Sequence, residues 1–304
     1  MRIAGPLAVG TAALALAGCA TPGAEIEQPV QAATSADPLD QPAPDSMRWL
    51  YGSGEAAAAS IQAYRMLVDY ALEAASAWPE ESAAMGLPDA VGGVGTASCR
   101  DSNGSAKPPA VVFDADETLI LNLGYEYWDA SNPGGYDPDV WSAWERDGAA
   151  HVAPVPGAVT ALRRLREAGI TPVFNTNRLA ENAEGTVAAL SAAGLGDAVH
   201  GETLFLKGDD ATGSRKDARR ETIAARYCVL ALAGDNLGDF ADVFNDGDRS
   251  PQARRELAGR GTFAQMWGNG WFVLPNPVYG ASIKGNVGEV FPPNARWMPS
   301  EEAE

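Results

Sequence analysis

The hydrophobic and polar positions of the chain change period along its length, and this change predicts where helices and strands lie. In residues 55–78 the apolar side chains recur every three or four positions, which is typical of a helix with one buried face, and Pro79 would stop it. The residues on that face are Ile61, Tyr64, Leu67, Val68, Ala71 and Leu72. Pro156 opens a second predicted helix, which Gly169 ends. Its inward-facing residues are Val159, Leu162 and Leu165.

Short apolar runs that end at Phe113, Phe174 and Ala233 predict buried strands with helical patterns between them. This alternation predicts an α/β fold, a Rossmann-like and mostly parallel sheet with helices on both faces. Residues 123–153 and 262–297 interrupt the alternation and are rich in aromatic residues, Gly and Pro. We expect these two segments to form a small, largely helical cap beyond the carboxyl ends of the strands. The remaining length suits one globular domain, which begins at residue 49 and extends to residue 304.

The first residues have the pattern of an export signal. A charged residue precedes an apolar stretch that is too short, and too rich in Ala and Gly, to remain as a membrane-spanning helix. The sequence Leu-Ala-Gly-Cys at 16–19 resembles a bacterial lipobox, so we expect a signal peptide at residues 1–18 and a lipidated Cys19. Residues 19–48, dense in Ala, Pro, Gln and Asp, predict a flexible stalk. The protein would be lipid-anchored in the cell envelope, and Ala20 favours the outer membrane, facing the periplasm.

The formal charge limits the partners of the chain. With 22 Lys and Arg set against 40 Asp and Glu, the net charge is −18 at pH 7, and no broad basic face for a nucleic-acid polymer could form. A small anionic substrate stays compatible if cations gather locally around it. Export also allows a disulfide between Cys99 and Cys228, but the sequence leaves both this pairing and two free thiols open.

The most informative chemical signal is an Asp-x-Asp-x-Thr motif, in which Asp114 and Asp116 follow a buried strand. An open α/β sheet binds ligands beyond the carboxyl ends of its strands, and alternate residues leaving a strand share a face. The two carboxylates can therefore converge on one phosphorus atom, one as nucleophile and the other as proton donor and base. Their mutual repulsion favours a divalent cation between them. A solvated acidic turn is the alternative interpretation of so short a motif.

Later segments supply groups that bind phosphate, in the order that phosphoryl chemistry requires. Thr176 and Asn177 end a second predicted strand, where a hydroxyl and backbone N–H groups could cradle a phosphate. Lys216 opens a predicted helix and could neutralise phosphate charge, although Lys207 is a rival for this role. Arg178 could add to a local positive pocket.

The last segment is Gly-Asp-Asn-x-x-Asp at the end of a third predicted strand. Its acids, Asp235 and Asp239, offer the hard oxygen ligands that suit Mg²⁺. A histidine-dependent phosphatase needs a nucleophilic His beside arginines, and neither His151 nor His200 has such a setting. The sequence therefore favours aspartate chemistry over histidine chemistry.

Together, the four motifs resemble those of the haloacid dehalogenase superfamily of phosphatases. The sequences at 113–122, 154–158 and 274–280 resemble more narrowly the bacterial lipoprotein e family, which comprises class C acid phosphatases and 5′-nucleotidases. This likeness covers most of residues 50–295. Leu121 departs from it, because many members carry Asp there, and this departure concerns substrate preference rather than the catalytic pair.

The resemblance implies a role for each motif residue. Asp114 would be the nucleophile that forms an aspartyl-phosphate, and Asp116 would be the general acid and base. Thr176 and the backbone at Asn177 would bind the phosphoryl group, which Lys216 would bridge to the nucleophile. The resemblance also suggests a homodimer and an acidic pH optimum.

The resemblance likewise implies a Mg²⁺ cofactor. The ion would lie between Asp114, the main-chain carbonyl of Asp116 and Asp235, with Asp239 orienting a metal-bound water. Thr118 would orient the nucleophile loop.

Aromatic residues in the two interrupting segments suggest that a nucleobase stacks at the mouth of the pocket. The candidates are Tyr125, Tyr127, Trp128 and Tyr279, of which the resemblance favours Tyr279. We therefore predict a magnesium-dependent acid phosphatase that hydrolyses small phosphomonoesters, in particular 5′-nucleotides. The alternatives are a phosphotransferase on the same scaffold and a non-enzymatic surface lipoprotein.

Overall fold

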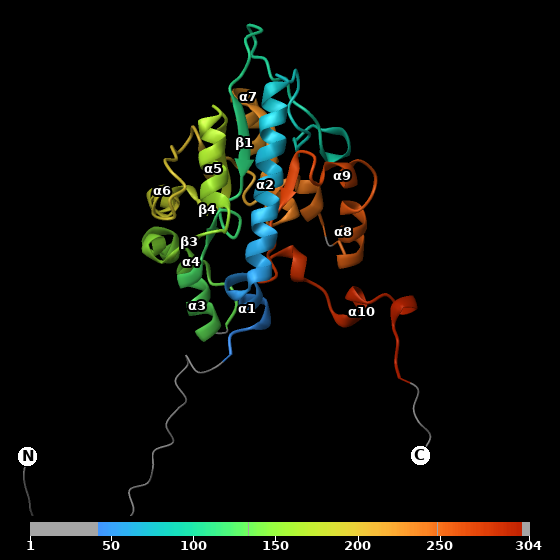
Figure 1. The fold of residues 1–304 in the computed structure, drawn as a ribbon. Helices are drawn as coiled ribbons and strands as arrows, with labels where there is room; N and C mark the ends of the chain where they lie inside the picture. Colours follow the sequence, from blue (N-terminus) through green and yellow to red (C-terminus); the bar gives the residue numbers. More distant parts are fainter. Residues whose placement is uncertain (1–41, 133, 248, 300–304) are drawn as a thin grey trace, which may run out of the picture. The chain divides into compact units, whose positions relative to one another are not determined.

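The computed structural model describes residues 42–132, 134–247 and 249–299 (Figure 1). The predicted signal peptide, Cys19 and most of the predicted stalk lie outside these residues. Within the described part, helix α1, Asp45–Gly52, already begins inside the segment that we expected to be stalk. None of the helices in the three described ranges is both long and apolar enough to cross a membrane.

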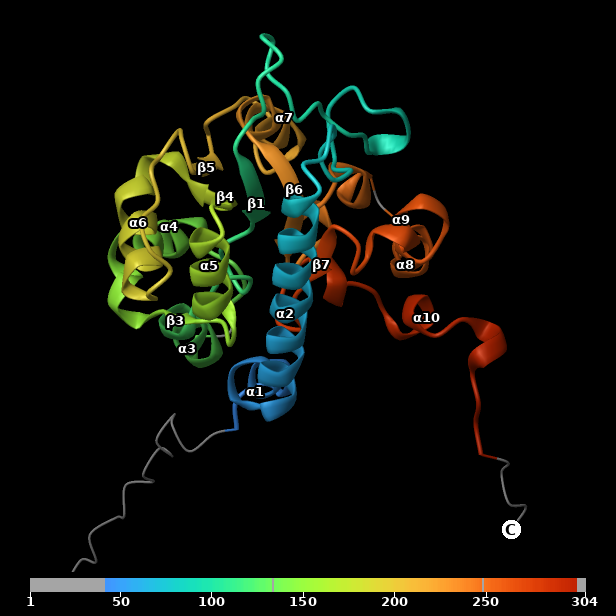
Figure 2. The same cartoon turned by 45° about the horizontal axis from the view of Figure 1, so that its top comes forward.

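Five parallel strands form the central sheet in the order β5-β4-β1-β6-β7 (Figure 2). Their bounds are Leu204–Lys207 for β5, Thr171–Leu179 for β4, Pro109–Phe113 for β1, Cys228–Gly234 for β6 and Trp271–Val273 for β7. The chain builds the sheet first to one side of β1 and then, after β5, to the other. This reversal places the carboxyl end of β1 where open α/β sheets bind ligands. The parallel sheet confirms the predicted α/β fold.

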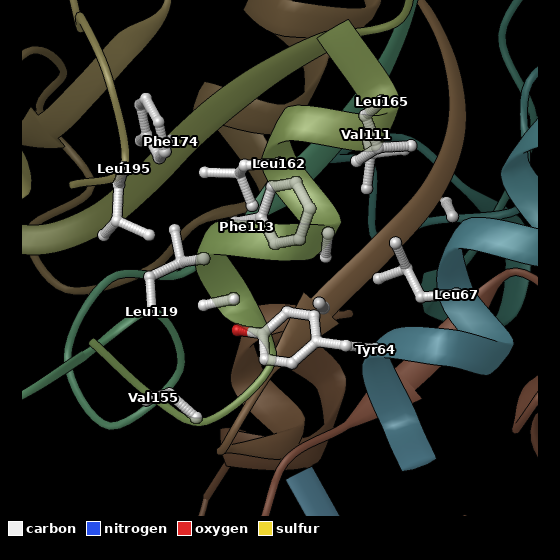
Figure 3. Close-up of a cluster of buried hydrophobic side chains, with 14 of the residues drawn as sticks. Tyr64, Leu67, Val111, Phe113, Leu119, Val155, Leu162, Leu165, Phe174 and Leu195 are labelled. Carbon is white, nitrogen blue, oxygen red and sulfur yellow. The ribbon is translucent and has the colours of Figure 1, made fainter. Parts of the chain in front are cut away.

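The helices on one face of the sheet are α2, Gly54–Ser76, α5, Ala158–Glu167, and α6, Ala183–Ala192. In both views α2 and α5 lie next to each other in front of the strands (Figures 1 and 2). Figure 3 shows part of the core beneath them, in which Tyr64 of α2 and Leu162 of α5 belong to the same buried cluster as Phe113 of β1. This face carries most of the apolar core that supports the β1 strand.

The inward faces of these helices agree with the predicted pattern except at their edges. Leu162 and Leu165 are fully buried, but Val159 is 37% exposed, so its predicted inward position is wrong. The buried residues of α5 are at positions 158, 161, 162 and 165, and Val159 lies beside this stripe rather than on it. In α2, Ile61 and Leu72 are half-buried for the same reason.

The helices on the other face are α7, Asp217–Arg226, α8, Pro251–Ala258, and α9, Gly261–Met266. Side chains alternate along β1, so that Val111 and Phe113 join the α2 core whereas Val112 joins the α7 core. Trp271 of β7 is fully buried in this second core and packs at 5.1 Å, between ring centroids, from Trp267. Both faces of the sheet are therefore covered, as predicted.

The first interrupting segment is helical, as expected, but the second is not a cap along its whole length. The first contains α3, Leu123–Ser131, α4, Pro138–Asp147, and the 3-10 helix η3, Gly148–His151. In the second, Trp271–Val273 pairs with β6 as the edge strand β7, so this part of the cap prediction is wrong. The aromatic residues of this strand, Trp271 and Phe272, lie in the core instead of over the pocket. Beyond β7 the chain forms η7, Ala281–Ile283, α10, Val287–Val290, and η8, Pro293–Ala295.

The remaining elements are short. Strands β2 and β3, Ile120–Leu121 and Ala153–Pro154, form a two-stranded antiparallel sheet. The other 3-10 helices are η2, Val91–Gly93, η4, Ala180–Asn182, η5, Leu237–Asp239, and η6, Asp242–Asn245.

A disulfide joins Cys99 to Cys228 across a sequence separation of 129 residues. Both cysteines are buried. The bond links the loop that precedes β1 to the first residue of β6. Of the two alternatives that the sequence left open, a disulfide or two free thiols, the structure has the disulfide. The bond therefore ties the chain that leads into β1 to β6, and the carboxyl ends of both strands carry acidic motifs.

Candidate active site

The loop that follows β1 carries the first acidic motif. Asp114 is buried, and its backbone N–H donates to the carbonyl of Ala233 in β6 at 2.9 Å. The hydroxyl of Thr118 donates to Oδ1 of Asp235 at 3.0 Å and ties the loop to the end of the neighbouring strand. Between them, Glu117 has a φ of 51°, a left-handed conformation that non-glycine residues seldom adopt. The loop is thus held in a constrained shape at the carboxyl edge of β1 and β6.

Lys216 is the cation that meets these carboxylates. Its Nζ donates to Oδ1 of Asp114 at 2.5 Å and to Oδ1 of Asp239 at 2.7 Å. The three side chains are at most 9% exposed. Burial lowers the pKa of Lys216, but the two carboxylates outweigh this effect and hold its pKa above the usual value. Lys207 ends β5 and lines the same cavity, but within the described ranges it makes no ion pair with either acid. The geometry therefore favours Lys216 over Lys207.

Asp114, Asp235 and Asp239 form a group of carboxylates suited to one cation. One oxygen from each lies within 4.8 Å of the others. Burial, and then the charge of Asp239, raise the pKa of Asp235 to about 7, although Asn276 donates to it at 2.8 Å. Burial also raises the pKa of Asp114, against the lowering effect of Lys216. The three carboxylates face one lysine, Lys216, so negative charge is in excess. Hard oxygen ligands with excess negative charge fit a divalent cation such as Mg²⁺.

Thr176 and Asn177 lie next to this acidic group and line the same cavity. They belong to β4, as predicted, and the strand continues beyond them to Leu179. The guanidinium of Arg219, which is buried, donates to the main-chain carbonyl of Thr176 and to Oδ1 of Asn177, the latter at 2.6 Å. The amide of Asn177 donates in turn to the carbonyl of Ser214 at 3.1 Å. The predicted phosphate cradle is therefore fixed from behind by a residue of α7.

Asp116 is held by Arg178 and Asn122. Nε of Arg178 donates to Oδ1 of Asp116 at 2.9 Å, and Nη2 donates to Oδ1 of Asn122 at 2.8 Å. The amide of Asn122 donates to the same oxygen of Asp116 at 3.0 Å. Arg178 is only 1% exposed, and Trp141 of α4 packs 5.8 Å from its guanidinium carbon. We expected Arg178 to supply positive charge to the pocket, whereas its contacts make it the residue that orients Asp116.

Glu117 links the loop after β1 to two distant parts of the chain. One of its carboxylate oxygens accepts a hydrogen bond from the hydroxyl of Tyr279, and the other accepts one from Tyr51 of α1 at 3.2 Å. Asn122 also donates its backbone N–H to Glu117 at 3.0 Å. Burial, and then the charge of Asp116, raise the pKa of Glu117 to about 8. The hydroxyl of Tyr279 is thereby fixed next to the loop after β1.

A cavity of about 1240 Å³ opens above these residues. Its walls come from α1, α3, α4, the loop before α8 and the segment that contains Tyr279. Tyr125 and Tyr279, two of the predicted aromatic candidates, line it. Tyr127 and Trp128 are not among its lining residues, and Tyr127 is 58% exposed. Of the residues predicted for the site, the structure brings the four motif aspartates, Thr176, Asn177, Lys216 and Tyr279 together around this cavity.

Glu117 and Arg219 are the residues of this arrangement that sequence reasoning missed. Glu117 lies inside the first motif, and its neighbours gave no sign that its side chain would turn inward. Arg219 lies three residues after Lys216, so it shares a face of α7 with the motif lysine, and this spacing was the available signal.

A model of the HAD superfamily, subfamily IIIB (acid phosphatase), matches residues 13–282 of the chain. Two solved structures of the class C acid phosphatase from Bacillus anthracis are also similar. The one with tungstate bound is 23% identical, has a TM-score of 0.59, and aligns over 78% of this chain and 84% of that chain. The other is 24% identical, with the same TM-score of 0.59 and the same coverage of 78% and 84%. At these identities the likeness bears on the fold.

Proposed function

The chain belongs to the HAD superfamily, subfamily IIIB of acid phosphatases, and from this premise we propose that it is a magnesium-dependent hydrolase that forms an aspartyl-phosphate on Asp114. The enzyme is a phosphoric monoester hydrolase. The observation that carries the proposed mechanism is the position of Lys216 between Asp114 and Asp239, with Asp235 beside them. A solvated acidic turn would not bury its carboxylates around a lysine.

The first chemical step would join Asp114 to the substrate. A carboxylate oxygen of Asp114 attacks phosphorus in line, and the bond from phosphorus to the leaving oxygen breaks. Asp116, oriented by Arg178 and Asn122, donates a proton to that oxygen. Lys216 holds the nucleophile in place and offsets the charge on the phosphoryl oxygens.

The second step would release inorganic phosphate. Asp116, now a carboxylate, accepts a proton from a water molecule that attacks phosphorus, and the bond to Asp114 breaks. Thr176 and Asn177 hold the phosphoryl group during both steps, and Arg219 prevents their backbone from moving away. Both acids return to their starting protonation states, so the cycle closes.

The carboxylates of Asp114 and Asp235, with the main-chain carbonyl of Asp116, would hold Mg²⁺, next to Asp239. When bound, the ion supplies positive charge that stabilises the phosphoryl oxygens as the bonds change. It would also keep Asp114 ionised, since burial and the surrounding acids oppose ionisation of that group. The class C acid phosphatase from Bacillus anthracis has been solved with tungstate bound, and we propose that a tetrahedral oxyanion can bind near Asp114 in this chain.

The proposed substrates are 5′-nucleotides. The cavity of about 1240 Å³ has room for a nucleoside beyond the phosphate site, and Tyr125 and Tyr279 line it. Aromatic rings stack on bases of any sequence. The hydroxyl of Tyr279, held by Glu117, fixes one of these rings in place.

Phosphate release from nucleoside 5′-monophosphates and an aryl phosphate, with Mg²⁺ or with a chelator, tests this assignment. We expect turnover with Mg²⁺, loss of turnover in chelator, and a preference for the nucleotides. Tyr279→Ala should raise KM for nucleotides more than for the aryl ester, because it removes a stacking surface worth about 1 to 3 kcal/mol per base. Tyr279→Phe is the matched control, because it keeps the ring. Full activity in chelator would contradict the metal requirement, and equal KM changes for both substrates would contradict base stacking.

We further propose that the enzyme is attached to the outer membrane, facing the periplasm, through lipid on Cys19, and that it is a homodimer. The lipobox pattern at 16–19 supports the anchor. A Cys19→Ser variant should appear in the soluble fraction of the envelope, whereas the wild type should be extracted only by detergent. Light scattering of the soluble domain tests the dimer, and a monomer mass at all concentrations would contradict it.

A further inference from the structure

Glu126, in the first turn of α3, is a buried acid that the proposed reaction does not use. The residue is 5% exposed and lines the cavity. Its carboxylate has no hydrogen-bond or ion-pair partner among residues 42–132, 134–247 and 249–299. A buried carboxylate that faces a cavity without a partner is unfavourable in the empty protein, and it is suited to a ligand that supplies the missing charge.

The nearby donors are engaged elsewhere. The side-chain amide of Asn122, one helical turn before Glu126, donates to Asp116 and Glu117. The hydroxyl of Tyr51 also donates to Glu117. The charges of Asp129 and Asp116 also act on Glu126, and both repel it. Glu126 therefore has acidic neighbours but no partner of opposite charge in the described residues.

A metal ion does not suit this wall. In the described part of the chain, Asp114, Asp235 and Asp239 form the group of acids whose ligand atoms lie within 4.8 Å of one another. Glu126 and Asp129 do not belong to this group. A cation whose charge is spread over several atoms fits the surroundings better, because Tyr125 directly precedes Glu126 in α3 and both Tyr125 and Tyr136 line the same cavity. Ammonium groups bind well between carboxylates and aromatic faces.

We propose that Glu126, assisted by Asp129, binds a positively charged nitrogen group of the substrate while the phosphate of the same molecule lies at Asp114. This inference rests on the proposed phosphatase function and adds a second substrate class beside the 5′-nucleotides. The added substrates are phosphomonoesters of amino alcohols or quaternary ammonium alcohols. The negative phosphate of such a molecule would lie at Lys216 and the phosphate cradle. Its positive nitrogen would lie at Glu126, with Tyr125 and Tyr136 in the same cavity.

A pair of isosteric esters tests the proposal. Phosphocholine carries a quaternary nitrogen, and 3,3-dimethylbutyl phosphate has the same shape with a neutral carbon in its place. For the wild type we expect kcat/KM for phosphocholine to exceed that for the neutral ester by about tenfold, as one charge-assisted contact would provide. Glu126→Gln should bring this ratio close to one. Glu289→Gln is the matched control, because Glu289 lines the same cavity but already accepts from the backbone of Asn286, and it should keep the wild-type ratio.

A wild-type ratio near one would overturn the proposal, as would an unchanged ratio in Glu126→Gln. An equal loss of kcat/KM for both esters in Glu126→Gln would also overturn it, because Glu126 would then act in folding or in the chemical step and not in binding the nitrogen group. Turnover of an aryl phosphate by the wild type separates these results from failure of the proposed function. If the aryl phosphate and both esters are all inert, the phosphatase proposal itself is wrong.

Discussion

Replacing Lys216 with Met would keep the length of the side chain but remove the charge that Asp114 and Asp239 face. Nζ of Lys216 lies 2.5 Å from Asp114 and 2.7 Å from Asp239, so the variant leaves two buried carboxylates without their cation. Removing one partner of a buried ion pair destabilises a protein by about 3 to 5 kcal/mol. Losing a charged group at the reacting oxygens should lower kcat by about 100- to 1000-fold.

Two assays separate these effects. Urea denaturation at pH 7 in chelator gives the free energy of unfolding, and phosphate release at saturating Mg²⁺ gives kcat. Lys207→Met is the matched control, because Lys207 lines the same cavity without an ion pair to Asp114 or Asp239 in the described structure. We expect this control to change stability by less than about 0.5 kcal/mol.

A further variant keeps the test valid if Lys216→Met folds poorly. Adding Asp239→Asn removes one of the two uncompensated charges, so stability should partly recover while kcat stays low. If Lys207→Met lowers kcat as much as Lys216→Met does, Lys216 does not have the role assigned to it. The same follows if Lys216→Met keeps more than about a tenth of the wild-type kcat.

Three other perturbations have expected outcomes. Reducing the Cys99–Cys228 bond, which spans 129 residues, should lower the free energy of unfolding by about 5 kcal/mol in urea titrations, and a change below about 1 kcal/mol would contradict this. Burial, and then the charges of Asp129 and Asp116, raise the pKa of Glu126 from 4.5 to about 7. The folded protein therefore favours the protonated form of Glu126. The stability that this contributes is complete below about pH 4.5 and is lost as the pH rises through 7. The free energy of unfolding of Glu126→Gln, relative to that of the wild type, should therefore rise by up to about 3 kcal/mol between pH 4 and pH 8 in denaturant titrations. A difference in stability that does not depend on pH would argue against this. In Arg178→Lys the shorter lysine side chain cannot reach both Asp116 and Asn122, so kcat should fall about tenfold with little change in KM. A wild-type kcat in steady-state kinetics would contradict this.

The strands and the acidic motifs could be predicted because their signals are local. Apolar runs bounded by helical patterns predicted β1, β4 and β6, and the acids that follow Phe113 and Gly234 had to meet at one edge once those strands were parallel. The periodic faces of α2 and α5 were predicted for the same reason. They failed at the margins of the stripes, at Val159, which is exposed, and at Ile61 and Leu72, which are half-buried.

The rest depends on contacts between distant parts of the chain. Trp271 looks like a cap residue from its aromatic surroundings, but it is buried because β7 pairs with β6. Glu117 turns inward because Tyr51 and Tyr279, 66 residues before it and 162 residues after it, donate to its carboxylate. No local pattern encodes such a meeting, since each side chain alone has the sequence context of an ordinary surface or core residue.

Whether Asp114 is the nucleophile can be measured by phosphate release from the wild type and from Asp114→Asn, in Mg²⁺ and in chelator, with mass spectrometry of acid-quenched enzyme. We expect metal-dependent turnover and a phosphorylated peptide containing Asp114 in the wild type, and neither in the variant. Equal turnover by both proteins, or a phosphoryl group on another residue, would contradict the assignment of Asp114 as the nucleophile.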